Sequence, residues 1–365
     1  MSAALIPAGF ADLAGWAEDA HAAAFAAFRR SAIYGLENGY KTGALGIGPE
    51  HLAPAWQEAA SIEADLSDAE ARSFFERHFA PRLIRPNNTA TGFVTGFYEP
   101  EVEASPARSE HFTVPLLSAP DDLVKVDDSN RPEGMDPYLA FGRRTPDGIV
   151  EYFDRAAIEQ GALGDKARAI AWVADPVDAF FIHVQGAARL KMPDGSVRRI
   201  TYAAKSGQRF TGPGRVLIKL GEIAEADVTM QSIRAWFADH PDRINEILWR
   251  NRSYIFFREA DVSDPLLGPV AAAKVPLTAG RSLAVDRRIH TFGTPFFIDA
   301  PTLLAFDEQP FRRLMIAQDT GSAIVGPARG DLFAGSGDAA GEIAGVVRHP
   351  ADFYILVPRP YGSAA

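Results

Sequence analysis

Residues 314–337, LMIAQDTGSAIVGPARGDLFAGSG, decide how this chain can be interpreted. The apolar run at residues 314–316 predicts a buried strand that ends at Asp319. Glycines bracket Asp319 and Asp331, which are 331 − 319 = 12 positions apart, and glycine allows a close backbone approach to a ligand. Carboxylates on Gly-rich connections at strand ends can form an acid–base site. The alternative for each aspartate alone is an Asx-turn, in which the carboxylate only caps its own backbone.

Size and composition narrow the class of protein. A chain of 365 residues is long for one core and predicts about two domains. A net charge of −10 argues against nucleic acid as a partner, since phosphate binding needs clustered Lys and Arg. Cysteine is absent, which excludes a disulfide framework, a thiol nucleophile and a Cys-based zinc site. We also expect no membrane-spanning helix and no secretory signal, because no apolar run reaches about 20 residues and the N-terminal stretch lacks a basic segment.

Periodicity predicts helices first and short strands afterwards. Apolar residues recur at helical spacing from Phe10 to Phe28 and again over residues 52–64. Ser67 and Glu70 form a capping box that predicts a third helix. Several further stretches show strand character or turn signals: an aromatic strand over 92–100, a linker over 105–137, strands at 170–173 and 180–184 joined by a loop at 175–178, and a hairpin over 189–202. The short strands predict a small β-barrel or sandwich in the middle of the chain.

Tyr98 and Glu99 close the aromatic strand at an acidic end. A ring can stack on a sugar and a carboxylate can bind its hydroxyl groups. The equal alternative is a core strand followed by a turn at Pro100.

Asp286, Asp319 and Asp331 each follow or interrupt an apolar run in the β-rich C-terminal part. Three carboxylates in one cleft would repel one another and raise at least one pKa, which suits a general acid near neutral pH. Glycosidic cleavage needs such an acid to protonate the leaving oxygen.

Two other interpretations compete with a glycan-cleaving enzyme. Residues 319–321 (Asp-Thr-Gly) match the aspartic-protease signature, but such proteases need two aspartates that share a proton, and the chain has no second copy. The residue before that aspartate is the polar Gln318, where the proteases have an apolar one. The third interpretation is a glycan-binding module without turnover. The eight histidines show no metal-binding spacing, and His183 is interpreted as a satisfied core residue.

The motifs, taken in order, resemble those of the membrane-bound lytic transglycosylase A (MltA) family of bacterial murein hydrolases. The resemblance covers about residues 92–358 and rests on residues 96–100 (GFYEP), 175–181 (DPVDAFF), 184–186 (VQG), Gly195, 230–236 (MQSIRAW), Asn251 with 253–257 (SYIFF), 277–278 with 280–286 (GRSLAVD), and 317–321 (AQDTG) with 323–324, Gly326 and Asp331. The last two stretches resemble the family's three-aspartate (3D) domain.

The resemblance implies a mainly β fold with peripheral helices. Residues 1–104 and 262–365 would form a double-psi β-barrel catalytic domain that includes the N-terminal helices. Residues 105–261 would form an inserted second β-barrel domain, which supplies the other wall of a glycan groove.

The resemblance also implies an activity. Such enzymes cleave the β-1,4 bond between N-acetylmuramic acid and N-acetylglucosamine without water, and the muramic acid C6 hydroxyl attacks to leave a 1,6-anhydro end. Asp331 matches the catalytic acid/base, and Asp319 and Asp286 would support it. No metal or cofactor is implied. The expected substrate-binding residues are Tyr98, Glu99, Gln185, Gly186, Thr320, Gly321 and Ala323.

Peptidoglycan glycan strands are the implied binding partner of a monomeric, periplasmic enzyme, with cell-wall synthesis or divisome proteins as candidate partners. The sequence departs from the family pattern in two places. The lipoprotein cysteine is missing, which bears on outer-membrane attachment. Ala187 and Ala188 stand where Ser-Gly is common, which bears on one subsite.

Overall fold

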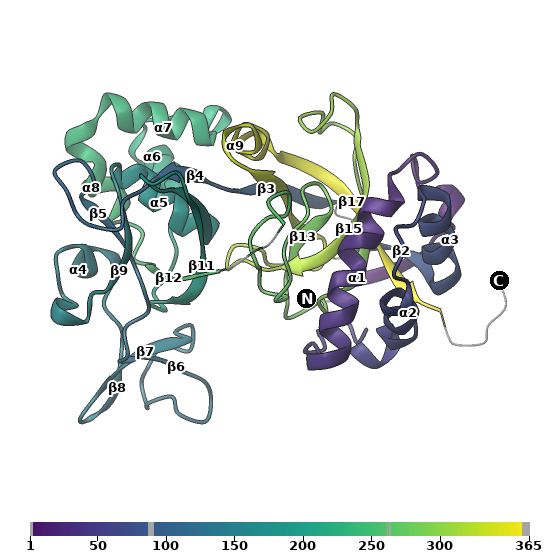
Figure 1. Cartoon of the computed structure of the whole chain (residues 1–365), viewed down its shortest axis with the longest axis horizontal. Helices are drawn as coiled ribbons and strands as arrows, with labels where there is room; N and C mark the ends of the chain where they lie inside the picture. The colour runs from purple at the N-terminus through teal and green to yellow at the C-terminus, as the bar shows by residue number, and fades with distance from the viewer. Residues whose placement is uncertain (1–2, 87–90, 261, 263, 360–365) are drawn as a thin grey trace. The chain divides into compact units, whose positions relative to one another are not determined.

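The computed structural model describes residues 3–86, 91–260, 262 and 264–359 (Figure 1). The chain divides into two compact units: unit 1 comprises Met1–Tyr98 and Val262–Ala365, and unit 2 comprises Glu99–Asp261. The chain passes from unit 1 into unit 2 after Tyr98, which is six residues (104 − 98) before the boundary after residue 104 that the resemblance implies. The reason is that β4 (Glu101–Glu103) pairs with β10 (Ala187–Lys191) inside unit 2.

Unit 1 is built on an eight-stranded sheet in the order β1-β2-β17-β14-β15-β13-β16-β3. Its strands are β1 (Ala3–Pro7), β2 (Phe79–Pro86), β3 (Gly92–Glu99), β13 (Ser282–Val285), β14 (Pro295–Ala300), β15 (Phe311–Asp319), β16 (Arg329–Ser336) and β17 (Arg348–Pro358). Strand β17 pairs with three other strands. Its residues 348–351 pair with β3, and its later residues pair with β14 and β2. The sheet therefore joins segments from both ends of the chain.

Three helices pack beside this sheet: α1 (His21–Asn38), α2 (Pro49–Ser61) and α3 (Asp68–His78) (Figure 1). Their apolar faces share one core with Phe297, Leu314 and Ile316 of the sheet. The predicted capping box opens α3, since the Ser67 hydroxyl accepts the Glu70 amide at 3.3 Å and the Glu70 carboxylate accepts the Ser67 amide at 2.8 Å. The fourth helix, α9 (Asp338–Val346), follows β16.

The helix expected from Phe10 begins only at His21, so its predicted start is wrong. Residues before His21 form a short 3-10 turn, Phe10–Asp12, and a looser segment. Asp19 explains the delay, because its carboxylate accepts the Leu314 amide at 2.7 Å and pairs with Arg281 at 2.8 Å. These tertiary bonds hold the segment in a non-helical path despite its apolar spacing.

Unit 2 holds three smaller sheets: β12-β11-β10-β4, β5-β9 and β6-β7-β8. Its other strands are β5 (Val114–Leu117), β6 (Leu123–Lys125), β7 (Phe141–Thr145), β8 (Gly148–Val150), β9 (Ala169–Val173), β11 (Val197–Lys205) and β12 (Ile255–Glu259), and its helices are α4 (Arg155–Glu159), α5 (Pro176–Gln185), α6 (Pro213–Leu220), α7 (Met230–Asp239) and α8 (Ile244–Leu248). The β10–β11 hairpin confirms the hairpin predicted over 189–202. Residues 105–137 hold β5 and β6, so this stretch is more than a linker.

The strand predicted at residues 180–184 is wrong, because these residues lie within helix α5. Asp175 caps the helix by accepting the Val177 amide at 2.7 Å, and Pro176 occupies the first turn, where its missing N–H costs nothing. Ile182 is buried in the core that holds β10, β5 and β9, whereas Phe180 and Phe181 pack with residues of α6, α7 and α8. A short buried apolar run has the same pattern in a strand and in a helix, so the cap was the better signal.

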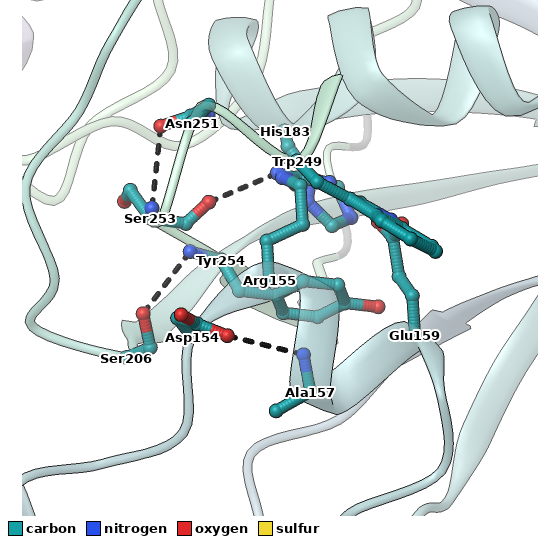
Figure 2. A network of polar contacts seen from close by, with 10 residues as sticks. All are labelled: Asp154, Arg155, Ala157, Glu159, His183, Ser206, Trp249, Asn251, Ser253 and Tyr254. Carbon is teal, nitrogen blue, oxygen red and sulfur yellow. Dashed lines mark hydrogen bonds and ion pairs between the residues drawn. The ribbon is translucent and has the colours of Figure 1, made fainter. Parts of the chain in front are cut away.

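A buried polar network holds α4, α5 and the segment before β12 together (Figure 2). Arg155 is only 2% exposed and donates to His183 Nδ1 at 2.9 Å, to the Ser253 carbonyl at 3.0 Å and to Glu159 at 2.8 Å. Desolvation and the Arg155 charge lower the pKa of His183 well below its usual range. His183 is therefore a neutral residue on a helix. Its place in the core was predicted, but it is not fully satisfied, because Nε2 has no hydrogen-bond partner among the described residues.

Candidate active site

Strand β13 lies between β15 and β16 and sets the positions of two aspartates. Ala284 pairs with Asp331 on one side and with Asp319 on the other. Residues opposite each other on neighbouring strands project to the same face of a sheet. Asp319 and Asp331 therefore share one face, with Ala284 between them.

A register shift between Leu283 and Ala284 makes this arrangement possible. Ala317 pairs with Leu283, so a regular ladder would put Gln318 opposite Ala284, whereas the shift puts Asp319 there. Such bulges re-aim side chains and are common beside active sites.

Gln318 is fully buried. Its side-chain amide donates to the Ala27 carbonyl at 2.9 Å and to the Ser31 hydroxyl at 2.8 Å, and its oxygen accepts from the Ser282 hydroxyl at 2.5 Å. This polar residue, unusual before an Asp-Thr-Gly, thus fastens β15 to α1 and β13.

Asp319 ends β15 in a desolvated position. Burial raises the pKa of its carboxyl to about 6, repulsion from Asp331 adds to the rise, and the amides of Thr320 and Ala272 oppose it. The Ala272 amide donates to Oδ1 at 3.2 Å. The group therefore exchanges a proton close to neutral pH.

Asp331 lies within β16, flanked by β13 and β3. Desolvation raises the pKa of its carboxyl, against the Thr95 hydrogen bond and the positive charge of Arg329. The Thr95 hydroxyl donates to Oδ1 at 2.5 Å, and Arg329 Nη2 donates to that hydroxyl oxygen at 2.7 Å. Asp331 as a residue is half-buried rather than fully buried.

Asp286 follows β13 and is 8% exposed. Its oxygens accept the amides of Arg288 and Gly326, each at 3.0 Å. The carboxylate thus ties the turn after β13 to the loop that leads into β16. This geometry suits a positioning role for that loop.

Of the residues after Asp319, Thr320 is half-buried, whereas Gly321 and Ala323 are exposed. The Thr320 hydroxyl donates to the Val285 carbonyl at 2.8 Å, which fixes the start of the turn. The Ile324 amide closes the turn on the Gly321 carbonyl at 3.0 Å.

Tyr98 belongs to unit 1 and is 6% exposed. Its ring lies against α9, where a Cβ added to Gly341 would meet a ring carbon at 2.9 Å. Stacking of this ring on a sugar stays a prediction.

Glu99, Gln185 and Gly186 belong to unit 2. Glu99 is fully buried and pairs with Arg189 at 2.8 Å. Gln185 ends α5, and Gly186 caps it at φ 77°, a left-handed conformation that glycine adopts without strain. The roles of these three in binding also stay predictions.

Thr95 and Arg329 are the residues that motif reasoning missed. Arg329 precedes Asp331 by two positions on a strand, so strand alternation places both on one face and could have identified it. Thr95 lies 236 positions from Asp331, and only the fold brings the two together. No group of three or more His, Asp or Glu suited to a metal ion occurs within the described residues.

Family models match both parts of the chain. The MltA specific insert domain matches residues 93–258, and the 3D domain matches residues 281–357. The second match holds Asp286, Asp319 and Asp331.

Known proteins similar to this chain carry the same family name. A crystal structure of membrane-bound lytic murein transglycosylase from Agrobacterium tumefaciens is 51% identical, covers 98% of each chain and superposes with a TM-score of 0.91. A structure of Escherichia coli MltA with bound chitohexaose is 25% identical, covers 99% of this chain and 93% of the other, and gives a TM-score of 0.67. Membrane-bound lytic murein transglycosylase A of E. coli K12 is 31% identical over 271 residues, which are 73% of this chain and 66% of that protein, just under two thirds of its length.

No helix among the described residues combines the length and apolar character needed to cross a bilayer.

The insert, the 3D domain and the full-length structural match all point to one family. This chain belongs to the membrane-bound lytic murein transglycosylase A (MltA) family.

Proposed function

We propose that this chain is a peptidoglycan lytic transglycosylase. It cleaves the β-1,4 bond between N-acetylmuramic acid and N-acetylglucosamine and leaves a 1,6-anhydro end. The observation that carries the proposal is the pair of desolvated carboxyls on one face, with the pKa of each raised. One protonated carboxyl is what glycosidic cleavage without a second catalytic base requires.

Asp331 is the proposed acid and base. In its protonated form it donates to the glycosidic oxygen, the bond from that oxygen to C1 breaks, and N-acetylglucosamine leaves with a free hydroxyl. The C6 hydroxyl of the muramic acid then forms the new bond to C1 and gives its proton to Asp331. The carboxyl ends protonated as it began, and no water enters the reaction.

Asp319 tunes this cycle through its charge. An anion nearby disfavours ionisation of Asp331 and favours positive charge that develops on the sugar ring. Asp286 acts through its hydrogen bonds to the Arg288 and Gly326 amides, which position the loop before β16.

The proposal also covers the fold of unit 1, the residues that contact the glycan and the place of action. We propose a double-psi β-barrel for the sheet of unit 1, supported by the pairing of β17 with both β3 and β14. Glycan contacts are assigned to Tyr98, Glu99, Gln185 and Gly186, together with the turn at Thr320, Gly321 and Ala323. Bound chitohexaose in the E. coli relative supports a glycan ligand. Peptidoglycan of the periplasm is the proposed place of action. We also propose association with the outer membrane, for which the name membrane-bound of the relatives is the support.

Mass spectrometry of murein digested with the purified protein tests the reaction. Anhydro ends, lighter than hydrolysed fragments by one water, are expected from the wild type. Asp331→Asn should reduce their formation about 100-fold or more. Ordinary reducing ends would overturn the mechanism.

Two other activities give different results in the same experiment. An aspartic protease would release peptides and lose activity in Asp319→Asn. A binding module would retain murein equally in the wild type and in Asp331→Asn and would release no muropeptides from either.

A further inference from the structure

A chain of hydrogen bonds ends on one oxygen of the Asp331 carboxyl. Arg329 Nη2 donates to Thr95 Oγ1 at 2.7 Å, and Thr95 Oγ1 donates to Asp331 Oδ1 at 2.5 Å. The direction of both bonds is fixed, because a guanidinium group only donates and a hydroxyl has a single proton. With its acceptor side occupied by Arg329, the Thr95 proton is directed at Oδ1.

Arg329 is itself held in place. Its other guanidinium nitrogen, Nη1, donates to the Gly330 carbonyl, and the group lies over the Phe93 ring at 5.6 Å. Thr95 and Phe93 are on β3, whereas Arg329 and Asp331 are on the neighbouring β16. The two strands therefore present the arginine, the threonine and the aspartate in one fixed order.

We propose that Arg329 and Thr95 are positioning residues that keep Oδ1 as a hydrogen-bond acceptor, so that Oδ2 carries the proton exchanged with the sugar. This inference rests on the proposed function. Oδ2 would give its proton to the glycosidic oxygen and take one back from the C6 hydroxyl, while Oδ1 stays bound to Thr95 throughout. A carboxyl with one assigned oxygen avoids a rotation between the two steps.

The charged groups around Asp331 affect its pKa, so the proposed arrangement can be tested through the pH dependence of turnover. Arg329 on β16 supplies positive charge that opposes the raised pKa of Asp331, and the charge of Asp331 raises the pKa of Asp319 on β15. On α9, which packs against β16, Asp338 and Glu342 are exposed. Loss of the Thr95 donor or of the Arg329 cation removes a group that favours the carboxylate, so the acid form persists to higher pH.

The test is the pH dependence of turnover in Thr95→Val, a substitution that keeps shape and removes the hydroxyl. We expect kcat to fall about tenfold, the effect of one hydrogen bond to a charged group. We also expect the basic limb of the profile to move up by about one pH unit. Thr95→Ser, which restores the donor, should return both values close to wild type.

Arg329→Met should move the limb in the same direction. If Arg329 acts through Thr95, the double variant should lose little more activity than the worse single variant. Thr294→Val is the matched threonine control, because Thr294 is buried in unit 1 and its hydroxyl has no partner among the described residues. Arg85→Met is the arginine control, since Arg85 pairs with Asp352 on other strands of the same sheet.

A wild-type kcat and an unmoved limb in Thr95→Val, with Asp331→Asn inactive, would overturn the positioning role and leave the proposed function standing. Anhydro products from Asp331→Asn would instead remove the proposed function. If a melting scan shows Thr95→Val to be unfolded, the pH profiles of Arg329→Met and Thr95→Ser test the positioning role instead. Positioning then requires the limb to move in Arg329→Met and to stay in Thr95→Ser.

Discussion

Asp319→Asn is the substitution that best tests the electrostatics of the site. It keeps the shape and the oxygen that accepts the Ala272 amide, and it removes the charge. Because Asp319 and Asp331 each pair with Ala284, their backbones are two strand spacings, or roughly 10 Å, apart. At an effective dielectric constant of about 20, two charges at that distance repel by about 1.7 kcal/mol.

The sign of the effect follows from the role of the acid. With the neighbouring charge gone, the pKa of Asp331 falls and its proton is lost at lower pH. The basic limb of kcat/KM should therefore move down by about one unit, opposite to the shift expected for Thr95→Val. The assay is release of anhydro ends from soluble glycan strands between about pH 4 and about pH 9.

A matched control is Asp299→Asn, which removes a carboxylate that pairs with Arg312 on β14 and β15. We expect no shift of the limb in this variant. An unmoved limb in Asp319→Asn would refute the reasoning about repulsion. A greater loss in Asp319→Asn than in Asp331→Asn would show that the proton is carried by Asp319.

Three further predictions concern stability. Arg155→Met removes the cation that pairs with Glu159 and should lower the free energy of unfolding in urea by about 3 kcal/mol; an unchanged midpoint would contradict this. Burial lowers the pKa of His290 to about 4, so below about pH 6.5 the unfolded chain takes up a proton that the native state does not. This difference lowers the free energy of unfolding by about 3 kcal/mol at pH 4, and we expect His290→Gln to remove that loss in melts at pH 4. In Gly43→Ala the new Cβ would lie 2.3 Å from the Ile289 carbonyl oxygen, so Tm should fall by several degrees, whereas an unaltered Tm would show that this loop yields.

The sequence predicted the elements whose signals are local. The buried strand that ends at Asp319 is confirmed as β15, and the capping box at Ser67 opens α3 as expected. The family resemblance is confirmed by both domain models and by the similar structures. Each of these rests on a short pattern or on a series of motifs.

What escaped prediction depends on contacts between distant residues. The register shift at Ala284 has no local sequence signature, yet it decides that Asp319 and not Gln318 faces Asp331. Thr95 reaches Asp331 only because β3 joins β16. Asp19 delays α1 through bonds to Arg281 and Leu314, which periodicity cannot show.

The pairing of β2 and β3 with β17 has a consequence for synthesis of the chain. Residues 79–86 leave the ribosome long before residues 354–358, with which they pair, and the whole of unit 2 is made between them. Unit 2 is contiguous and compact, so we expect it to fold as it emerges, whereas the edge of β2 that pairs with β17 must wait, and unpaired strand edges are prone to aggregation. Translation pauses after unit 2, or loss of a holding chaperone, should therefore harm yield through unit 1.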